Sequence, residues 1–238
     1  GINYYSLNML SEGVKTFILD MINDSWTTGL VPKQWKLASI KPILKINNKA
    51  ADLDNLRPIS ITPCFGKVME KMIQTRLHRF LEYNNLYHSS QCGFRKSHSC
   101  ADNLVKLYTI TKQAVIADEF NITVFLDFSK AFDKIWIDGL LLKLIKIGLS
   151  GRIYNWLKDF LSNRSYYVSL NGHCSNQFKI DNGVPQGSCL SPILFTIMTH
   201  DFPPLSQRTH SLLFADDSAI SRSGHDIDSL RFKIQTDL

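Results

Sequence analysis

Apolar residues recur along the chain at intervals of three and four positions, which is the spacing of helices that bury one face. This periodicity predicts helices over residues 12–26, 65–81, 101–117, 140–147, 153–161 and 192–200. In the third of these helices, the predicted inward face consists of Leu104, Leu107, Tyr108, Thr111 and Val115. Each such helix needs a partner surface, so the pattern indicates a packed globular chain.

Shorter apolar runs lie between these helices and predict strands. One covers residues 38–46 and contains Pro42, which favours the edge of a sheet because proline donates no hydrogen bond to a neighbour. Residues 122–126 form a nearly continuous apolar run, which predicts a strand buried on both faces. Paired runs flank Asn171-Gly172, as in a β-hairpin. Helices mixed with hairpins indicate an α+β fold.

Two adjacent carboxylates, Asp216 and Asp217, separate two further apolar runs. This arrangement predicts a tight hairpin with both aspartates at its tip, where water solvates them. Such turns are common without any function. A third carboxylate, Asp127, directly follows the strand predicted to be buried, and there it must reach solvent or a partner. Ser129 is placed to cap a short helix over residues 130–133.

The composition narrows the class of protein. The 238 residues are 44% hydrophobic and 20% charged, which is enough for a globular core. A net charge of +6 favours a polyanionic partner, although solvated lysines alone produce the same value. The richest apolar stretch, residues 140–149, contains two lysines and is shorter than the roughly 20 residues of a membrane span. The chain has no signal-peptide pattern and no initial methionine, so we expect a piece of a longer polypeptide.

The cysteines point to a reducing compartment. There are five, without a Cys-x-x-Cys pair: Cys64, Cys92, Cys100, Cys174 and Cys189. An odd, scattered set favours free thiols over disulfides. Cys92, His98 and Cys100 lie close enough in sequence to be metal ligands, but no fourth ligand follows at a spacing typical of zinc sites.

Three loops carry residue types that contact nucleotides or phosphates. The candidates are Lys45, Arg57, Arg95, Lys96, Gln186 and Gly187. The first two flank one polar loop and together could grip a phosphate. The next two lie before a predicted helix, where they could meet a nucleic-acid backbone. The last two combine an amide that donates and accepts with a glycine that permits close backbone approach. Each loop taken alone is equally typical of a solvated surface.

The carboxylates suggest a common chemistry if the fold brings them together. Asp127, Asp216 and Asp217 could then hold two divalent cations roughly 4 Å apart. Two magnesium ions in such a site promote in-line phosphoryl transfer, because one activates the attacking hydroxyl and the other neutralises the leaving group.

Six segments, in this order, resemble the reverse transcriptase domain of non-LTR (LINE-type, jockey- or CR1-like) retrotransposons. They are Trp35–Ala38, Leu56–Ser60, Gln91–Lys96, Leu126–Asp133, Asn182–Ser188 and Phe214–Asp217. The resemblance implies a right-hand polymerase with fingers and palm, in which an antiparallel palm sheet is flanked by helices. Residues 1–120 are then mainly fingers with an N-terminal helical segment. Residues 121–238 are mainly palm, truncated after the Asp-Asp hairpin and without a thumb.

The same resemblance implies roles for individual residues. Asp127 and Asp216 are the main metal ligands, the backbone carbonyl of Phe128 adds a ligand, and Asp217 is the adjacent catalytic carboxylate. Phe132 is the steric gate, because an aromatic ring in that place clashes with a ribose 2′-OH.

Three more residues receive a role on the nucleotide. Gln186 contacts the incoming nucleotide and the template region, and Lys45 and Arg57 contact the triphosphate. Of these assignments, that of Lys45 depends most on loop length.

The implied function is that of an RNA-directed DNA polymerase, a nucleotidyltransferase that adds deoxynucleotides to a primer 3′-OH. Its cofactors are two Mg²⁺ ions, with Mn²⁺ as a substitute. Its partners are an RNA template, a DNA primer and deoxynucleoside triphosphates, without a membrane. The resemblance also implies intracellular, nuclear action. Two alternatives stay open: a catalytically inactive retroelement fragment that only binds nucleic acid, and an RNA polymerase, which Phe132 disfavours.

Overall fold

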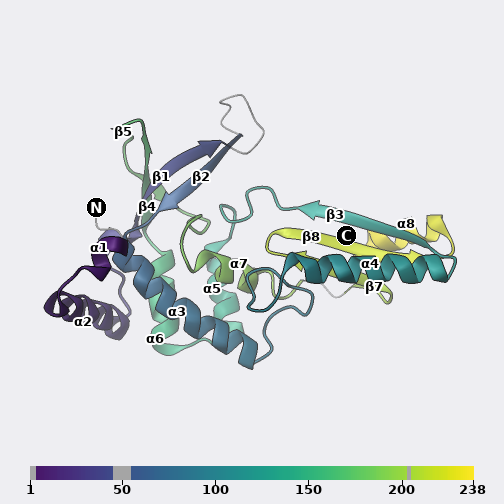
Figure 1. The fold of residues 1–238 in the computed structure, drawn as a ribbon, viewed down its shortest axis with the longest axis horizontal. Coiled ribbons are helices and arrows are strands. Elements are labelled where there is room, and N and C mark those ends of the chain that lie inside the picture. The colour runs from purple at the N-terminus through teal and green to yellow at the C-terminus, as the bar shows by residue number, and fades with distance from the viewer. Residues whose placement is uncertain (1–3, 45–54, 203–204) are drawn as a thin grey trace. The chain divides into compact units, whose positions relative to one another are not determined.

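The computed structural model describes residues 4–44, 55–202 and 205–238. Its contacts divide the chain into two compact units (Figure 1). The first unit consists of Gly1–Phe80 and Phe132–Leu194, and the second of Leu81–Ala131 and Phe195–Leu238. The assignment of residues 1–120 to fingers and 121–238 to palm stays a prediction. Within the described ranges, no helix has both the length and the apolar character needed to cross a membrane.

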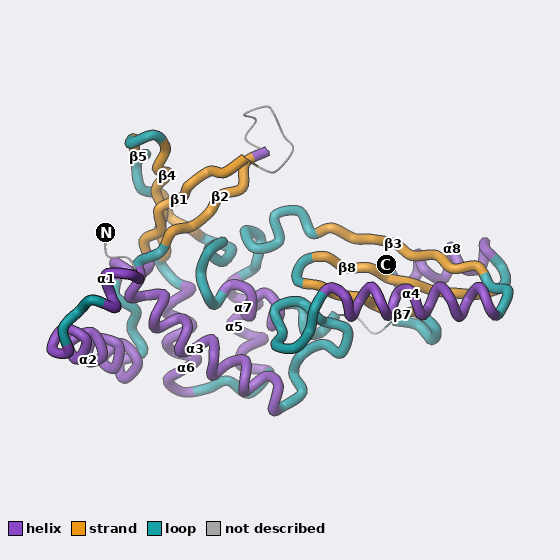
Figure 2. The backbone as a smooth tube through the Cα atoms, viewed as in Figure 1, coloured by secondary structure: helices purple, strands orange, loops and turns teal. Residues whose placement is uncertain are grey.

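The first unit contains a five-stranded sheet, drawn in orange in Figure 2. The strands follow the order β2-β1-β4-β5, and β6 also pairs with β4. The β1–β2 pair is antiparallel, whereas β1 and β4 run parallel. The strand bounds are β1 (Leu37–Leu44), β2 (Leu56–Ile61), β4 (Arg164–Leu170), β5 (His173–Cys174) and β6 (Phe178–Ile180). The predicted Asn171-Gly172 hairpin is confirmed, because both residues have positive φ and join β4 to β5.

The helices of the first unit pack mainly on one another, and their apolar faces form its core. Trp156 stacks on Phe160 with ring centroids 5.3 Å apart, and its indole N–H donates to Ser25 Oγ at 3.0 Å. A short ion pair of 2.8 Å joins Lys36 to Asp159. The helices are α1 (Tyr4–Asn8), α2 (Glu12–Thr28), the 3-10 helix η1 (Lys33–Lys36), α5 (Ile137–Lys146) and α6 (Gly151–Leu161). Two more, α3 (Cys64–Tyr83) and α7 (Ser191–Met198), begin in the first unit and end in the second.

The expected edge position of the strand that contains Pro42 is wrong. β1 has β2 on one side along residues 39–44 and β4 on the other along residues 37–40. Pro42 lies beyond the end of the β4 pairing, and its partner on β2 is Pro58. Neither proline has an N–H, so neither can donate a backbone hydrogen bond to a neighbouring strand. The two prolines are therefore paired with each other, outside the part of β1 that pairs with β4.

The second unit is built on a three-stranded antiparallel sheet of order β3-β8-β7. Its elements are α4 (Cys100–Ile116), β3 (Phe120–Asp127), β7 (Thr209–Phe214), β8 (Asp217–Gly224) and α8 (Ile227–Asp237). Both α4 and α8 pack against this sheet, and Figure 1 shows α4 running along the strands. Residues 218–222 of the central strand β8 are all buried. The structure therefore confirms the predicted α+β class.

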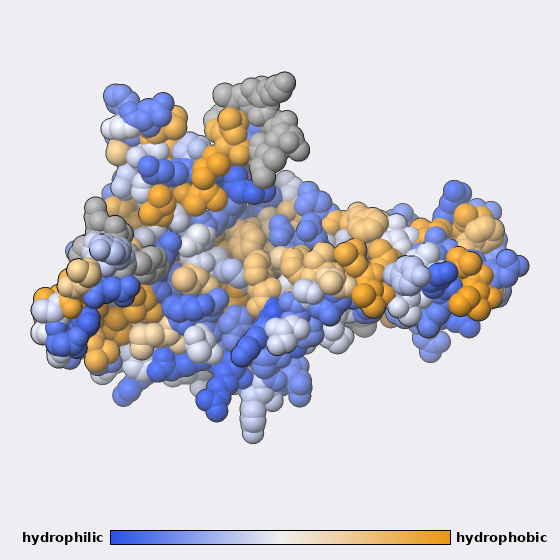
Figure 3. Space-filling model, in the orientation of Figure 1, coloured by the Kyte–Doolittle hydropathy of each residue, from blue (hydrophilic) through white to orange (hydrophobic). Residues whose placement is uncertain are grey.

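Three local predictions in this region are wrong. β3 is not buried on both faces: it is an edge strand, and Phe125 is 72% exposed. The inward face of α4 is turned from the predicted one, because Ile110 and Ala114 are buried whereas Leu104 and Val115 are exposed. Orange groups along α4 in Figure 3 correspond to such exposed apolar side chains. Residues 129–134 form turns rather than the short helix expected after Ser129.

Candidate active site

The Asp-Asp hairpin predicted from the sequence is present in the second unit, but its tip differs. Phe214 pairs with Asp217 across the turn, so the two turn residues are Ala215 and Asp216. Asp217 is the first residue of β8 and not part of the tip. Ala215 has φ 58°, a left-handed conformation that costs a residue with a Cβ about 1–2 kcal/mol. The turn is therefore strained at the residue before the two aspartates.

The third carboxylate lies directly across the sheet from this hairpin. Asp127, the last residue of β3, is the register partner of Asp217. Directly opposite residues of an antiparallel pair have Cβ atoms roughly 4.5–5.5 Å apart and share one face. Asp216 is the adjoining turn residue. The second unit thus gathers at one sheet end the three aspartates that lie up to ninety residues apart in sequence.

The chemistry of these donors fits a hard divalent cation. Asp127 and Asp217 are exposed and Asp216 is half-buried. Among the described residues of this unit, none forms a hydrogen bond or an ion pair with the three carboxylates. Like charges placed opposite each other repel, and a cation removes that repulsion. Carboxylate oxygens open to water suit magnesium or manganese better than a thiophilic metal.

A buried glutamine holds the strained turn. Gln91 is 2% exposed, and its Oε1 accepts hydrogen bonds from Ala215 N at 3.0 Å and from Gly93 N at 2.7 Å. Its Nε2 donates to Ala215 O at 3.3 Å. The side-chain amide therefore binds both polar backbone groups of the strained residue. The sequence places Gln91 in a segment of resemblance but does not indicate this contact, which joins residues 124 positions apart.

Gly93 lies against the same turn. A Cβ atom at this position would overlap the backbone N of Ala215 and lie 2.8 Å from its Cα. The backbone of Cys92 also bonds to β7, because its N–H donates to Leu213 O at 2.9 Å. Residues 91–93 and the carboxylate hairpin are thus in direct backbone contact. At position 93 only glycine permits this contact, because any other residue has a Cβ atom.

In the first unit, the loop that contains Gln186 is bound to the segment that contains Phe132. Val184 N donates to Phe132 O at 2.9 Å, and Gly183 N donates to Ile135 O at 2.8 Å. The loop also meets β2, because Ser60 N donates to the Gln186 carbonyl at 2.7 Å. These bonds make the two predicted substrate-contacting residues part of one fixed surface.

The side chain of Gln186 is oriented by a residue that the sequence did not single out. Its Nε2 donates to both carboxylate oxygens of Asp133, each at 3.0 Å. Because an ionised carboxylate only accepts, the Gln186 amide must direct its N–H groups to Asp133. The sequence feature that could have indicated this role is the position of Asp133 directly after Phe132, the predicted steric gate.

Gly187 follows Gln186 with φ 129°, and a Cβ there would overlap Ser60 O. The backbone of β2 therefore approaches this glycine closely, which is a contact within the protein and not the predicted approach of a ligand. Its predicted contact with nucleic acid stays a prediction.

Glu70 of α3 fixes the end of the same loop. Its Oε2 accepts from Ser188 Oγ at 2.5 Å and from Cys189 N at 2.8 Å. Burial raises the pKa of Glu70, while these hydrogen bonds and the nearby Arg164 guanidinium lower it. Arg164 is itself buried, and this burial lowers its pKa to about 10. The loop is therefore held at both ends by groups inside the first unit.

The predicted basic residues have different surroundings. Arg95 forms two hydrogen bonds with Glu82, at 3.1 and 2.9 Å, and lies 4.7 Å from the ring centroid of Tyr87. The guanidinium is thus engaged within the second unit, whereas Lys96 is exposed. Arg57 is exposed on β2, and Lys45 lies outside the described residues. Their contacts with nucleotide or nucleic acid stay predictions.

The predicted site residues divide between the two units. The second unit contains the three aspartates, Phe128, Arg95 and Lys96, and the first contains Phe132, Gln186, Gly187 and Arg57.

Comparisons with known proteins identify relatives of this chain. The chain is 32% identical over 222 residues to the RNA-directed DNA polymerase from mobile element jockey of Drosophila melanogaster, which covers 90% of this chain and 24% of that protein. It is 35% identical over 202 residues to the probable RNA-directed DNA polymerase from transposon X-element of the same species, which covers 82% and 22%. The chain thus spans about a quarter of the length of these relatives.

The fold has counterparts among solved structures. Apo telomerase from Candida tropicalis superposes with a TM-score of 0.60 at 12% sequence identity, over 95% of this chain and 46% of that one. This likeness concerns the fold alone. The family model described as reverse transcriptase (RNA-dependent DNA polymerase) matches residues 45–234. Since that match covers most of the sequence and the jockey-like resemblance is confirmed, the chain belongs to the reverse transcriptase family.

Proposed function

We propose that this chain is the polymerising part of an RNA-directed DNA polymerase, which adds deoxynucleotides to a primer 3′-OH on an RNA template. The observation that carries the proposal is the pairing of Asp127 with Asp217 beside Asp216 at one end of the β3-β8-β7 sheet. Further support comes from the relatives whose names state this activity and from a telomerase of the same fold solved with a fragment of telomeric RNA.

The proposal assigns the carboxylates to two magnesium ions, with manganese as a substitute. Asp127 and Asp216 are the main ligands, the Phe128 carbonyl adds one, and Asp217 is the adjacent carboxylate. When bound, such ions activate the primer hydroxyl and neutralise the triphosphate. The contribution of the chain is to hold these oxygens in place. Gln91 and Gly93 serve this purpose by fixing the turn before Asp216.

The first unit supplies the groups that select the nucleotide. Phe132 excludes a ribose 2′-OH, Gln186 contacts the incoming nucleotide and the template, and Arg57 and Lys45 bind the triphosphate. Lys96, Arg95 and Gly187 contact the nucleic acid. The hydrogen bonds from the Gln186 loop to residues 132–135 support a common role for Phe132 and Gln186, because they join the two segments that carry these side chains. The similarity to polymerases of mobile elements supports nuclear action.

Primer extension tests the proposal. The purified chain, in parallel with the longest natural polypeptide that carries it, is incubated with poly(rA)·oligo(dT), labelled dTTP and Mg²⁺. We expect incorporation that requires both the template and the divalent ion. Binding of the template–primer without incorporation by either protein would contradict the proposal and support the inactive, nucleic-acid-binding alternative.

Replacing Phe132 by valine tests the steric gate. We expect the preference for dTTP over UTP to fall by roughly 10–200-fold, the range expected when a small steric contact is removed from a pocket. The measurement is the ratio of kcat/KM for the two nucleotides. The conservative Phe132→Tyr variant keeps a ring and should keep the preference. An unchanged ratio in Phe132→Val would remove this residue as the gate.

Replacing Asp133 by alanine tests whether it positions Gln186. A hydrogen bond to a charged group contributes about 1.5–3 kcal/mol, so loss of the contact should raise the KM for dTTP about tenfold or more. The effect on kcat should be smaller, and Asp133→Asn should restore part of the affinity because its amide oxygen still accepts. Asp181→Ala, an exposed aspartate of the same unit, is the control. A loss of kcat at unchanged KM would show that Asp133 acts in another way.

A further inference from the structure

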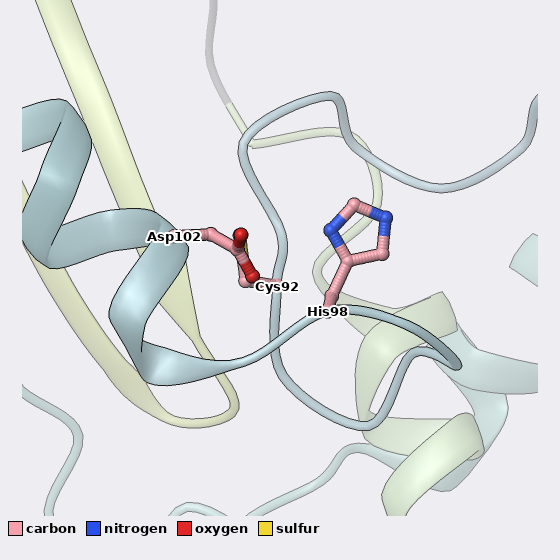
Figure 4. A group of neighbouring side chains, drawn as sticks. All are labelled: Cys92, His98 and Asp102. Carbon is pink, nitrogen blue, oxygen red and sulfur yellow. The ribbon is translucent and has the colours of Figure 1, made fainter.

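A cluster of three unlike side chains lies in the second unit, outside the carboxylate site. The ligand atoms of Cys92, His98 and Asp102 all lie within 4.8 Å of one another. Figure 4 shows Cys92 and His98 on the loop before α4 and Asp102 on the first turn of that helix. The sequence suggested Cys92 and His98 as ligands together with Cys100, and the structure adds Asp102 as the third member.

Asp102 is held in place by the start of α4. Its Oδ2 accepts from Ser99 N at 2.6 Å and from Ser99 Oγ at 3.1 Å. These hydrogen bonds fix the orientation of the carboxylate at the start of the helix. The capping bonds use one oxygen, and a carboxylate can coordinate a cation through the other. Asp102 is therefore a charged ligand with a fixed orientation, as expected when neighbouring groups support a metal ligand.

Cys92 is held by the strand that leads to the Asp-Asp hairpin. Its backbone N–H donates to Leu213 O at 2.9 Å, and its Sγ lies 3.4 Å from Asn103 Oδ1. The Asn103 amide is itself oriented, because its Nδ2 donates to the same Leu213 carbonyl at 2.9 Å. The sulfur is thus fixed on the rigid side of the cluster.

His98 is the adjustable member. It is exposed and follows Ser97, whose φ of 63° turns the chain back towards α4. Tetrahedral zinc, with a Zn–S distance of about 2.3 Å and a Zn–N distance of about 2.0 Å, requires the two donor atoms to lie about 3.5 Å apart. Rotation of the exposed imidazole can bring its nitrogen closer to the Cys92 sulfur.

We propose that Cys92, His98 and Asp102 form a zinc-binding site. Sulfur, imidazole nitrogen and carboxylate oxygen are all zinc ligands, whereas magnesium does not take a thiolate. The fourth position is open to water. On binding, the Cys92 S–H bond breaks, its proton passes to solvent and the sulfur binds the ion, with no change in oxidation state. The ion then links the loop of Gln91 and Gly93 to α4.

Cobalt titration of the purified chain tests this site, since Co²⁺ adopts zinc geometry and reports thiolate ligation by a charge-transfer absorption band. Excess Mg²⁺ is present to occupy the hairpin carboxylates. We expect one equivalent of Co²⁺ to produce the band and Zn²⁺ to abolish it. Cys92→Ser should lose the band, and His98→Ala should weaken binding by about tenfold or more. Cys189→Ser, a thiol of the first unit, should behave as the unaltered chain.

The variants separate a metal site from a folding defect. His98 is exposed, so His98→Ala should retain the circular dichroism spectrum and thermal transition of the unaltered chain. Absence of the band in the unaltered chain would overturn the proposal. So would a band that persists in Cys92→Ser, or cobalt affinity that His98→Ala leaves unchanged.

Discussion

Replacing Asp127 or Asp216 by asparagine should abolish primer extension and leave the fold intact. Asparagine has the same shape, but its neutral amide holds a divalent cation far less strongly than a carboxylate does. We expect a loss on the order of 10³-fold or more in kcat, equivalent to about 4 kcal/mol of transition-state stabilisation. The measurement is the single-nucleotide incorporation rate at saturating dTTP and Mg²⁺, together with the thermal transition of each variant.

The register of the sheet makes a third variant informative. Asp217 is the direct partner of Asp127, whereas Asp216 is the turn residue that the family resemblance makes a main ligand. We expect Asp217→Asn to lose less activity than Asp216→Asn. Asp228→Asn, an exposed residue of α8 in the same unit, is the control and should keep full activity. Incorporation above about a tenth of the normal rate in Asp127→Asn would refute the metal-ligand assignment.

Gly93→Ala should reduce primer extension by about 10²-fold or more, although position 93 carries no chemistry. The added methyl group would overlap the backbone of Ala215, so the turn before Asp216 must move. A displacement of about 1 Å in a catalytic group can cost roughly 10²-fold in rate. The substitution also overpacks a buried contact, which costs about 1–3 kcal/mol of stability. Activity is therefore measured below the thermal transition of the variant.

Two further variants assign the cause of this loss. Gly13→Ala, in α2, meets nothing within 4 Å and should be neutral or stabilising, because alanine favours the helix over glycine. Gln91→Glu keeps the acceptor for Ala215 N and Gly93 N but loses the donor to Ala215 O, so it should lower the rate by a smaller factor. Full activity in Gly93→Ala would show that the turn does not depend on this contact.

Much of the local structure follows from the sequence, because periodicity and turn chemistry act over short distances. The long helices, the Asn171-Gly172 hairpin and the hairpin at Asp217 were predictable in this way. The errors arose where a neighbouring element decided the outcome. Leu104 and Val115 have the spacing of an inward face, but the sheet contacts α4 along Ile110 and Ala114. Likewise, β3 is apolar enough to be central but has a strand on one side only.

In the candidate site, too, short motifs identified the residues, whereas contacts between distant residues could not be predicted. The identities of Asp127, Asp216, Asp217, Phe132 and Gln186 were recognisable in sequence, because their segments resemble a known family in order and spacing. The residues that hold them in position were not recognisable in the sequence. Gln91 reaches Ala215 across 124 residues, and Gln186 reaches Asp133 across 53. Hydrogen bonds of this kind depend on which backbones meet, and no local pattern of residues encodes them.

The sequence by itself determined the class of fold, the family and the candidate site residues, since each depends on composition, periodicity or short motifs. The tertiary structure alone decided that Asp217 faces Asp127, that the tip of the hairpin is Ala215-Asp216, and that Gln91 and Gly93 hold it. It also brought Asp102 to Cys92 and His98. The physical reason is that strand register and loop packing are settled by contacts between distant segments, which form only when the sheet of the second unit assembles.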